Sequence, residues 1–240
     1  MSLRSRFWLI TIATLSGVVL TLSLSWWQLS RAHQKEALQA AIVAQGQLAP
    51  VNSHTFATEP NPSAFIHRVT KLRGAWVGAR TIFLDNRQMN AKPGFYVITP
   101  LLIENSQQAV LIQRGWVARN FTDRANIPPV PTPTGVVEIE GRIAPPPSKL
   151  YDLGAAETGV IRQNLDMAAF RVETGLALLP VSIVQTGAAN DALLREWPVV
   201  ASSASKNYGY AFQWAGLSLL ITLLYVWFQI GKQFFSKHPA

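Results

Sequence analysis

Two long apolar runs without a charged residue lie near the two ends of this 240-residue chain. The first extends from Phe7 to Trp27 and the second from Tyr210 to Ile230, so each has 21 residues. At ~1.5 Å per residue, an α-helix of that length spans the roughly 30 Å hydrocarbon layer of a bilayer. The runs predict transmembrane helices at 7–27 and 210–230, with an extramembrane domain of residues 50–209 between them.

Each run also has a second interpretation. A cleaved signal peptide has an apolar region of about 7–15 residues, and Ser23 and Ser25 are small enough to precede a cleavage site. A buried core helix is the alternative for the second run, although 18 or more uncharged apolar residues are typical of a membrane helix. Trp26 and Trp27 close the first run and suit the aromatic belt at a membrane surface.

Two spans would place both termini on one side of the membrane. The cytoplasm is the favoured side for the tails 1–6 and 231–240, because basic residues flank the outer ends of both runs, at Arg4, Arg6, Lys232 and Lys237. Basic residues at the inner ends weaken that signal: Arg31, Lys35 and Lys206. Residues 28–49 are rich in helix formers and lack Gly or Pro until Gly46, which predicts a helical stalk beyond the first span.

Composition narrows the classes of function. Only 14% of residues are charged, against roughly 25% in soluble domains, and two membrane segments account for such a deficit. The net charge of +8 would suit nucleic acid or anionic lipid. Nucleic acid is not expected, because the sequence has no arginine-rich helix or zinc spacing and its aromatic residues are not interleaved with basic ones. The absence of cysteine excludes disulfides and thiolate metal sites.

The region between the runs predicts a mainly antiparallel β domain, a sandwich or small barrel of α+β type. One helix is expected from Asp166 to Thr174, capped by Asn164 or Asp166 and ended by Gly175. Proline-rich segments, "IPPVPTPTG" and "APPPSK", cannot continue a strand ladder and mark loops. The expected strands are Arg68–Val77, Thr81–Arg87, Gly94–Thr99, Ala109–Val117, Val136–Ile143, Val160–Asn164 and Pro180–Val184.

Two arginines at strand ends are candidates for partner binding. Arg87 lies in "FLDNRQ" and Arg114 in "LIQRGW". A charged cluster followed by glycine often marks only a turn, whereas two guanidiniums could offer planar forks to the carboxylate of a ligand or a partner.

The four histidines form no HxxH or HExxH pair. His67 and His238 fit ordinary surface positions, and a ligand role is the alternative considered for His33 near the membrane surface. No nucleotide-binding or serine-hydrolase motif is present. We therefore expect no enzyme and no metal site.

Five sequence blocks in order resemble the surfeit-locus-one family, membrane proteins that assist cytochrome c oxidase assembly. The resemblance covers roughly residues 7–230. Trp27, Gln28, Arg31 and Lys35 carry the first block and Tyr210 with Trp214 the last. The blocks are "WWQLSRAHQKEAL", "HRVTKLRGAWV", "TIFLDNRQMNAKPGFYVITPL" with "VLIQRGWVARN", "IRQNLDMAAFRVETG" and "YGYAFQWAGLSL".

The resemblance implies a bacterial inner-membrane protein whose central domain is periplasmic. Its partners would be the oxidase catalytic subunit or other assembly factors, besides the lipid bilayer. Besides the strand-end arginines Arg87 and Arg114, the candidates for partner binding are Trp27, Gln28 and Arg31 of the first block.

The resemblance also implies transient contact with haem a during its placement in the oxidase. Bacterial relatives are proposed to hold haem a through a histidine just before the second span, and Asn207 stands at that position here. Asparagine is a poor haem-iron ligand compared with imidazole. The haem-facing region would comprise Asn207, Tyr208, Tyr210 and Trp214. A general membrane scaffold without haem is the alternative function, and a periplasmic enzyme is the third.

Overall fold

The computed structural model describes residues 2–120, 122, 127–151, 158–188, 191–199 and 203–231. The chain divides into two compact units. The helical unit combines Met1–Ala40 with Val199–Ala240, and the β unit comprises Ala41–Pro198. The tail with Lys232, Lys237 and His238 lies outside the described residues.

The helical unit is built from α1 (Leu3–Gly46) and α4 (Ala204–Tyr225), and a π-helical turn, η4 (Val226–Gly231), continues the second. α1 contains no proline, which would interrupt it, and it runs unbroken through the expected span and into the expected stalk as far as Gly46. Both helices are long and apolar enough to cross a membrane, and most of their apolar stretch is not buried inside the protein.

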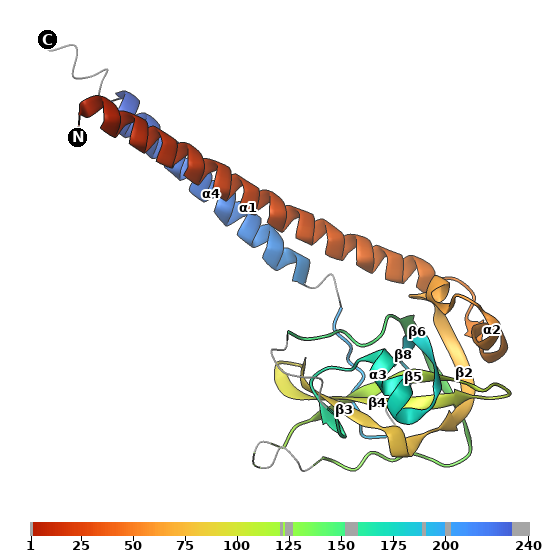
Figure 1. The fold of residues 1–240 in the computed structure, drawn as a ribbon. Helices are drawn as coiled ribbons and strands as arrows, with labels where there is room; N and C mark the ends of the chain where they lie inside the picture. Colours follow the sequence, from red (N-terminus) through yellow and green to blue (C-terminus); the bar gives the residue numbers. More distant parts are fainter. Residues whose placement is uncertain are drawn as a thin grey trace, which may run out of the picture. The chain divides into compact units, whose positions relative to one another are not determined.

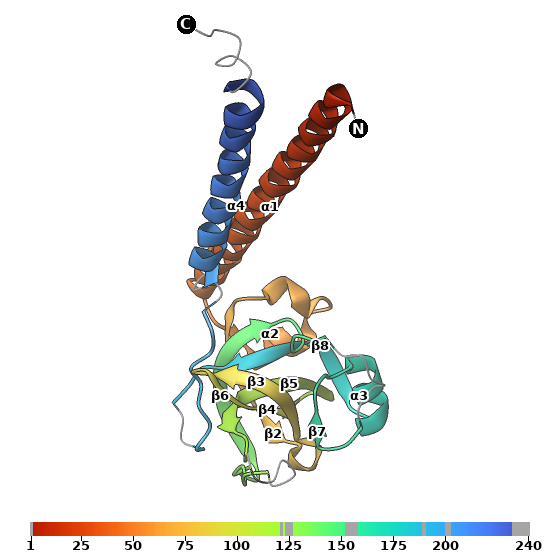
Figure 2. The ribbon, with the colours of Figure 1, turned by 90° about the vertical axis from the view of Figure 1, so that its left-hand side faces the viewer.

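The two helices lie side by side and antiparallel (Figures 1 and 2). Near one end Ser25 Oγ donates to the carbonyl of Ala211 at 2.9 Å, and near the other the hydroxyls of Thr11 and Tyr225 lie 2.8 Å apart. Small and hydroxylated residues are buried at this contact, which lets helix backbones approach closely in a membrane: Thr21, Ser25, Ala211 and Ser218.

Eight strands of the β unit form one sheet, in the order β1–β2–β6–β8–β5–β4–β3–β7. The strands are β1 (Val51–Asn52), β2 (Val69–Trp76), β3 (Ile82–Met89), β4 (Lys92–Ile103), β5 (Gln108–Ala118), β6 (Val136–Ala144), β7 (Ile161–Arg162) and β8 (Ala177–Gln185). A second pairing of β2, with β4, closes β2, β6, β8, β5 and β4 into a ring. Most pairs are antiparallel, and β1–β2, β3–β7 and β5–β8 are parallel. The expected mainly antiparallel β domain is confirmed, and of the two expected architectures, sandwich and small barrel, the ring of strands is a barrel.

Gly74 permits the ring to close. It pairs with Ile103 at the β2–β4 seam, and a Cβ added at Gly74 would lie 2.3 Å from the carbonyl oxygen of Leu102. A side chain at this position would therefore push the two strands apart.

Side chains of β5 pack into two separate apolar cores, which explains its continuous apolar run. Val110 and Ile112 join the core shared by the ring strands and α2 (Ser53–Thr58). Ala109 and Leu111 join a second core beneath α3 (Met167–Thr174), on the other face of the strand. β5 is thus buried on both faces, with one apolar core on each side of the strand.

Local sequence sets the ends of α3. The carboxylate of Asp166 accepts hydrogen bonds from the backbone N–H groups of Ala168 and Ala169, and Gly175 follows the last turn with φ of 67°. This is the capping predicted from the sequence, and it holds Phe170 in the second core. Two short 3-10 helices, η1 (Pro62–Phe65) and η2 (Gly78–Arg80), flank β2.

Candidate functional site

Three polar side chains join α1 to the N-terminal end of α4 within the helical unit. Lys35 Nζ donates to Asn207 Oδ1 at 2.6 Å, and Asn207 Nδ2 donates to Gln28 Oε1 at 2.6 Å. Gln28 and Lys35 lie seven residues apart on α1, so they share one helix face. We call Gln28, Lys35 and Asn207 the interhelix clasp. The amide of Asn207 uses both its oxygen and its nitrogen in the clasp.

Tyr208 ties α4 to α1 beside the clasp. Its hydroxyl donates to Glu36 Oε2 at 2.9 Å. The ring of His33 lies 6.1 Å from the Tyr208 ring in an edge-on contact. His33 and Tyr208 therefore contact each other, and the hydrogen bond from Tyr208 to Glu36 links the two helices.

The other helical residues of the predicted haem-facing and partner-binding sets take no part in the interhelix clasp. Tyr210 and Trp27 are 53% and 54% exposed, and Trp214 is half-buried. Arg31 is exposed and reaches Gln34 on its own helix at 3.4 Å. The structure thus brings Gln28 to Asn207 and leaves Trp27 and Arg31 on the surface of α1.

Arg87 is buried inside the β unit, with 5% of its surface exposed. Its Nη2 donates to the carbonyls of Ser148 at 2.8 Å and Gln163 at 3.1 Å. Its guanidinium also lies 5.9 Å from the centre of the Tyr96 ring. Burial lowers the pKa of Arg87 from its ordinary value.

Arg114 is buried more deeply, at 2% exposure. Its guanidinium donates to the carbonyl of Pro131 at 2.7 Å and to Thr132 Oγ1 at 3.0 Å. It stacks 4.7 Å from the centre of the Trp76 ring, a cation–π contact. Arg114 therefore fastens the proline-rich loop to the barrel.

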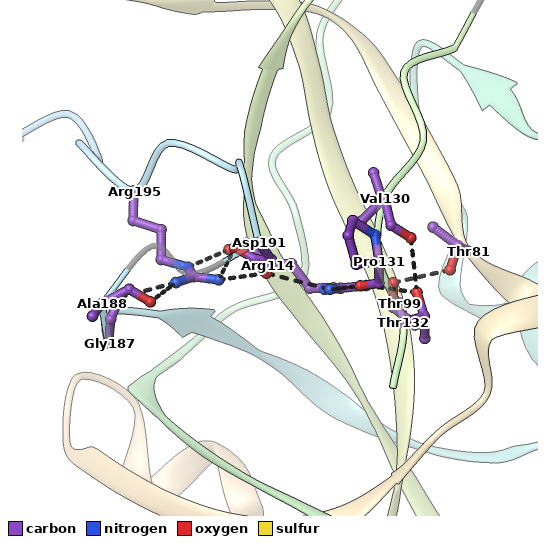
Figure 3. A network of polar contacts seen from close by, with 10 residues as sticks. All are labelled: Thr81, Thr99, Arg114, Val130, Pro131, Thr132, Gly187, Ala188, Asp191 and Arg195. Atoms are coloured by element: carbon purple, nitrogen blue, oxygen red, sulfur yellow. Dashed lines mark hydrogen bonds and ion pairs between the residues drawn. The ribbon is translucent and has the colours of Figure 1, made fainter. Parts of the chain in front are cut away.

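Asp191 connects Arg114 to a second arginine, as Figure 3 shows. Asp191 Oδ2 lies 3.3 Å from Arg114 Nη2, and both carboxylate oxygens lie 2.7 Å from Arg195 Nη2. Arg195 Nε also donates to the carbonyl of Arg114 at 2.7 Å. We call Arg114, Asp191 and Arg195 the ionic cluster. Burial lowers the pKa of Arg114, and the charge of Asp191 offsets part of this shift.

Arg87 and Arg114 are both buried, and their binding to a partner carboxylate stays a prediction. Their Nη donors bond to groups of the same chain. We therefore assign both arginines a structural role in the β unit.

Two features of the site were not recognised in the sequence. The first is the link from Lys35 to Asn207, for which the seven-residue spacing of Lys35 from Gln28 on one helix face is the available signal. Asp191 and Arg195 have the i, i+4 spacing of an ion pair, which is a weak signal in a segment without expected structure.

The β unit also has a hollow of about 650 Å³ beside α2 and the turn before β5. Both basic residues that line it form ion pairs, Arg73 with Glu104 at 3.4 Å and Lys71 with Glu140 at 3.7 Å. Among the described residues, no three side chains of the metal-ligating types form a group suited to a metal ion.

Comparison with known proteins gives three matches that agree. The SURF1 family matches residues 15–219. A SURF1-like protein of Rickettsia prowazekii is 26% identical over 232 residues, which cover 90% of this chain and 88% of that protein. The cytochrome oxidase assembly protein SHY1 of Saccharomyces cerevisiae is 25% identical over 100 residues, which cover 42% of this chain and 26% of the yeast protein.

Proposed function

This chain belongs to the SURF1 family, and on that premise we propose that it is a membrane-anchored assembly factor for cytochrome oxidase. The observation that carries the proposal is the family match, which takes in the whole β unit and parts of both long helices. The similarity to the yeast assembly protein supports it. The partners in this proposal are the oxidase catalytic subunit or other assembly factors, and the role is binding rather than catalysis.

Deleting the gene for this protein is expected to lower the amount of assembled oxidase in the cell well below the wild-type level. The physical reason is that a partly assembled subunit exposes surface that a binding factor would otherwise cover. Oxidase absorbance of the membranes measures assembly, and an immunoblot of the catalytic subunit separates lost assembly from lost synthesis. Restoring the wild-type chain should restore the absorbance. An unchanged oxidase level in the deletion strain would contradict the proposed function.

We further propose that both α1 and α4 cross the bacterial inner membrane and that the β unit is periplasmic. The two helices are antiparallel, so two crossings return the chain to the side where it began. Basic residues at the outer ends support cytoplasmic tails: Arg4 and Arg6 in the first turn of α1, and Lys232 and Lys237 after η4.

A topology reporter tests this orientation. An enzyme active only in the periplasm should work when inserted into the Pro128–Pro133 loop and fail when fused after Ala240. The reason is that the loop belongs to the β unit, whereas the tail follows the second crossing. The opposite pattern would reverse the orientation, and activity at both positions would mean that one helix does not cross.

The finer part of the proposal concerns haem a. The position where a ligand histidine is expected holds Asn207, whose oxygen and nitrogen are both bonded in the interhelix clasp. His33 packs against Tyr208. The described residues therefore do not fit an imidazole-ligated haem at this place. We propose that the protein assists haem a placement by holding the oxidase subunit as a scaffold, without ligating haem at Asn207.

A further inference from the structure

A strained turn in the β unit places a histidine beside an arginine. The turn Phe65–Arg68 is closed by Arg68 N donating to the carbonyl of Phe65 at 3.0 Å. Ile66 has φ −53° and ψ 134°, and His67 has φ 78°. These values describe a type II turn, whose third residue is normally glycine or asparagine. A histidine at this position is strained, and backbone strain of this kind concentrates at functional sites.

His67 is also the extra residue of a β-bulge at the start of β2. Ile143 N donates to the carbonyl of Arg68 at 2.9 Å, whereas the carbonyl of Ile143 accepts from His67 N at 2.8 Å. Two residues, His67 and Arg68, thus oppose Ile143 alone. Bulges re-aim a side chain and are frequent beside functional sites. The bulge and the turn together determine where the His67 ring lies.

The His67 ring lies against Arg142, the residue before Ile143 on β6. Arg142 Nη1 is 3.4 Å from His67 Nδ1, and both side chains are half-buried. Burial, followed by the charge of Arg142, lowers the pKa of His67. A neutral ring that accepts at Nδ1 carries its proton on Nε2. The pair therefore presents guanidinium N–H groups and an imidazole N–H.

The charge of Arg142 has no acid beside it in the described part of the chain. Each neighbouring basic residue on β2 does: Lys71 Nζ is 3.7 Å from Glu140, and Arg73 Nε is 3.4 Å from Glu104. No described carboxylate forms an ion pair with Arg142. A half-buried arginine without a counter-charge is energetically unfavourable, and an acid from outside the chain would supply the missing charge.

We propose that His67 and Arg142 form a recognition site for a carboxylate side chain of a protein partner. The guanidinium offers the planar donors that match a carboxylate, and the imidazole, whose Nδ1 lies beside Arg142 Nη1, positions the guanidinium. With His67 neutral, the pair carries one positive charge, which one carboxylate balances and a doubly charged phosphate exceeds. This inference rests on the proposed function, because an assembly factor needs a surface on which a protein subunit docks.

Arg68 does not form part of this site. Its Nη2 donates to the carbonyl of Ala49 at 2.6 Å, and its guanidinium stacks 5.3 Å from the centre of the Phe65 ring. The recognition site therefore consists of His67 and Arg142.

The test uses the full chain in nanodiscs of neutral lipid, with the histidine rings labelled for NMR. A short polyglutamate peptide should shift the His67 ring signal to saturation, and a polylysine peptide should leave it unchanged. Arg142→Gln should weaken polyglutamate binding about tenfold or more, as expected for the loss of a charge-assisted hydrogen bond. Arg73→Gln is the matched control and should leave the affinity unchanged, because Arg73 already has its own acid.

A second variant separates binding from folding. His67→Gly relieves the strained turn, so the thermal midpoint should hold or rise, while affinity for polyglutamate should fall. Its matched control is Asn105→Gly, at another non-glycine residue with positive φ, 59°, which should not change the affinity.

Three results would overturn the carboxylate site. They are no shift of the His67 signal, an equal loss of affinity in Arg73→Gln, and a shift with anionic lipid but not with polyglutamate. The last result would assign the site to a lipid phosphate. The outcomes remain separate from the proposed function: normal oxidase in the deletion strain with intact polyglutamate binding would remove the assembly role and keep the site. Loss of oxidase in the deletion strain, together with no polyglutamate-induced shift of the His67 signal, would keep the assembly role and remove the site.

Discussion

Asp191→Ala is expected to lower the free energy of unfolding of the β unit by about 3–5 kcal/mol, the usual cost of removing one partner from a buried ion pair. Asp191 is the acid that Arg114 and Arg195 share, and these side chains are only 2% and 6% exposed. Without it, two buried guanidiniums lose their counter-charge. Denaturant unfolding of the full chain, followed by tryptophan fluorescence, measures the change, because Trp76 stacks on Arg114.

An exposed ion pair of the same sheet provides the control. Lys71 and Glu140 are 3.7 Å apart, and both side chains are more than half exposed. Glu140→Gln should therefore cost no more than about 1 kcal/mol. Asp191→Asn keeps the size and part of the hydrogen bonding of Asp191, so its effect should lie between the two. A loss in Asp191→Ala no larger than in Glu140→Gln would show that the cluster is solvated and contributes little.

The ionic cluster also fastens the end of the β unit that leads toward α4. Arg195 donates to the carbonyls of Gly187 and Ala188, and Trp197 Nε1 donates to the carbonyl of Gln185 at 2.7 Å. These bonds hold the segment after β8 against the barrel. A weakened cluster should therefore free this segment as well as destabilise the core.

Most strands of the β unit could be predicted from the sequence because alternating burial leaves a pattern. In β2, the buried residues Thr70, Leu72 and Gly74 alternate with exposed Lys71 and Arg73, the period of a strand with one wet face. The expected segment Arg68–Val77 lies within one residue of the observed ends at each side.

Barrel closure could not be predicted, because it depends on contacts distant in the chain. The seam needs Gly74 to meet the backbone of Leu102, and a glycine in a strand has several other meanings. The parallel pairing of β5 with β8 could not be predicted either, because it joins Leu111 to Ser182 across β6, β7, α3 and the loops between them. β1 has only two residues and was not expected.

The burial of Arg114 was hidden for the same reason. In the sequence, an arginine before a glycine at a strand end looks the same whether its side chain faces solvent or the core. Its partners are Thr132 and Asp191, which lie 18 and 77 residues away along the chain. The interhelix clasp joins Lys35 to Asn207 over 172 residues. The sequence therefore has an asparagine where the resemblance implies a histidine, but it does not reveal the hydrogen bonds that this asparagine makes.

A second large effect is expected at Asn207, whose amide is bonded in the interhelix clasp. We expect the wild-type protein to carry little haem a, and we expect Asn207→His to raise the haem occupancy severalfold. Imidazole is a common axial ligand of haem iron, and the aromatic residues Tyr210 and Trp214 remain in the variant. The measurement is the absorbance spectrum of detergent-purified full chain from cells that make haem a. Asn207→Gln, which keeps an amide and adds no imidazole, is the matched control and should match the wild type.

Lys35 makes the prediction more specific. Its Nζ donates to Asn207 Oδ1, and in Asn207→His the same ammonium would donate to a ring nitrogen that iron also requires. Adding Lys35→Met to Asn207→His should therefore raise haem occupancy above that of the single variant, because methionine keeps the length of the side chain and removes the donor. His33→Ala should change little, since His33 packs on Tyr208 at 6.1 Å between ring centres. Stoichiometric haem a in the wild type that disappears in His33→Ala would contradict this account and make His33 the ligand in place of the missing histidine.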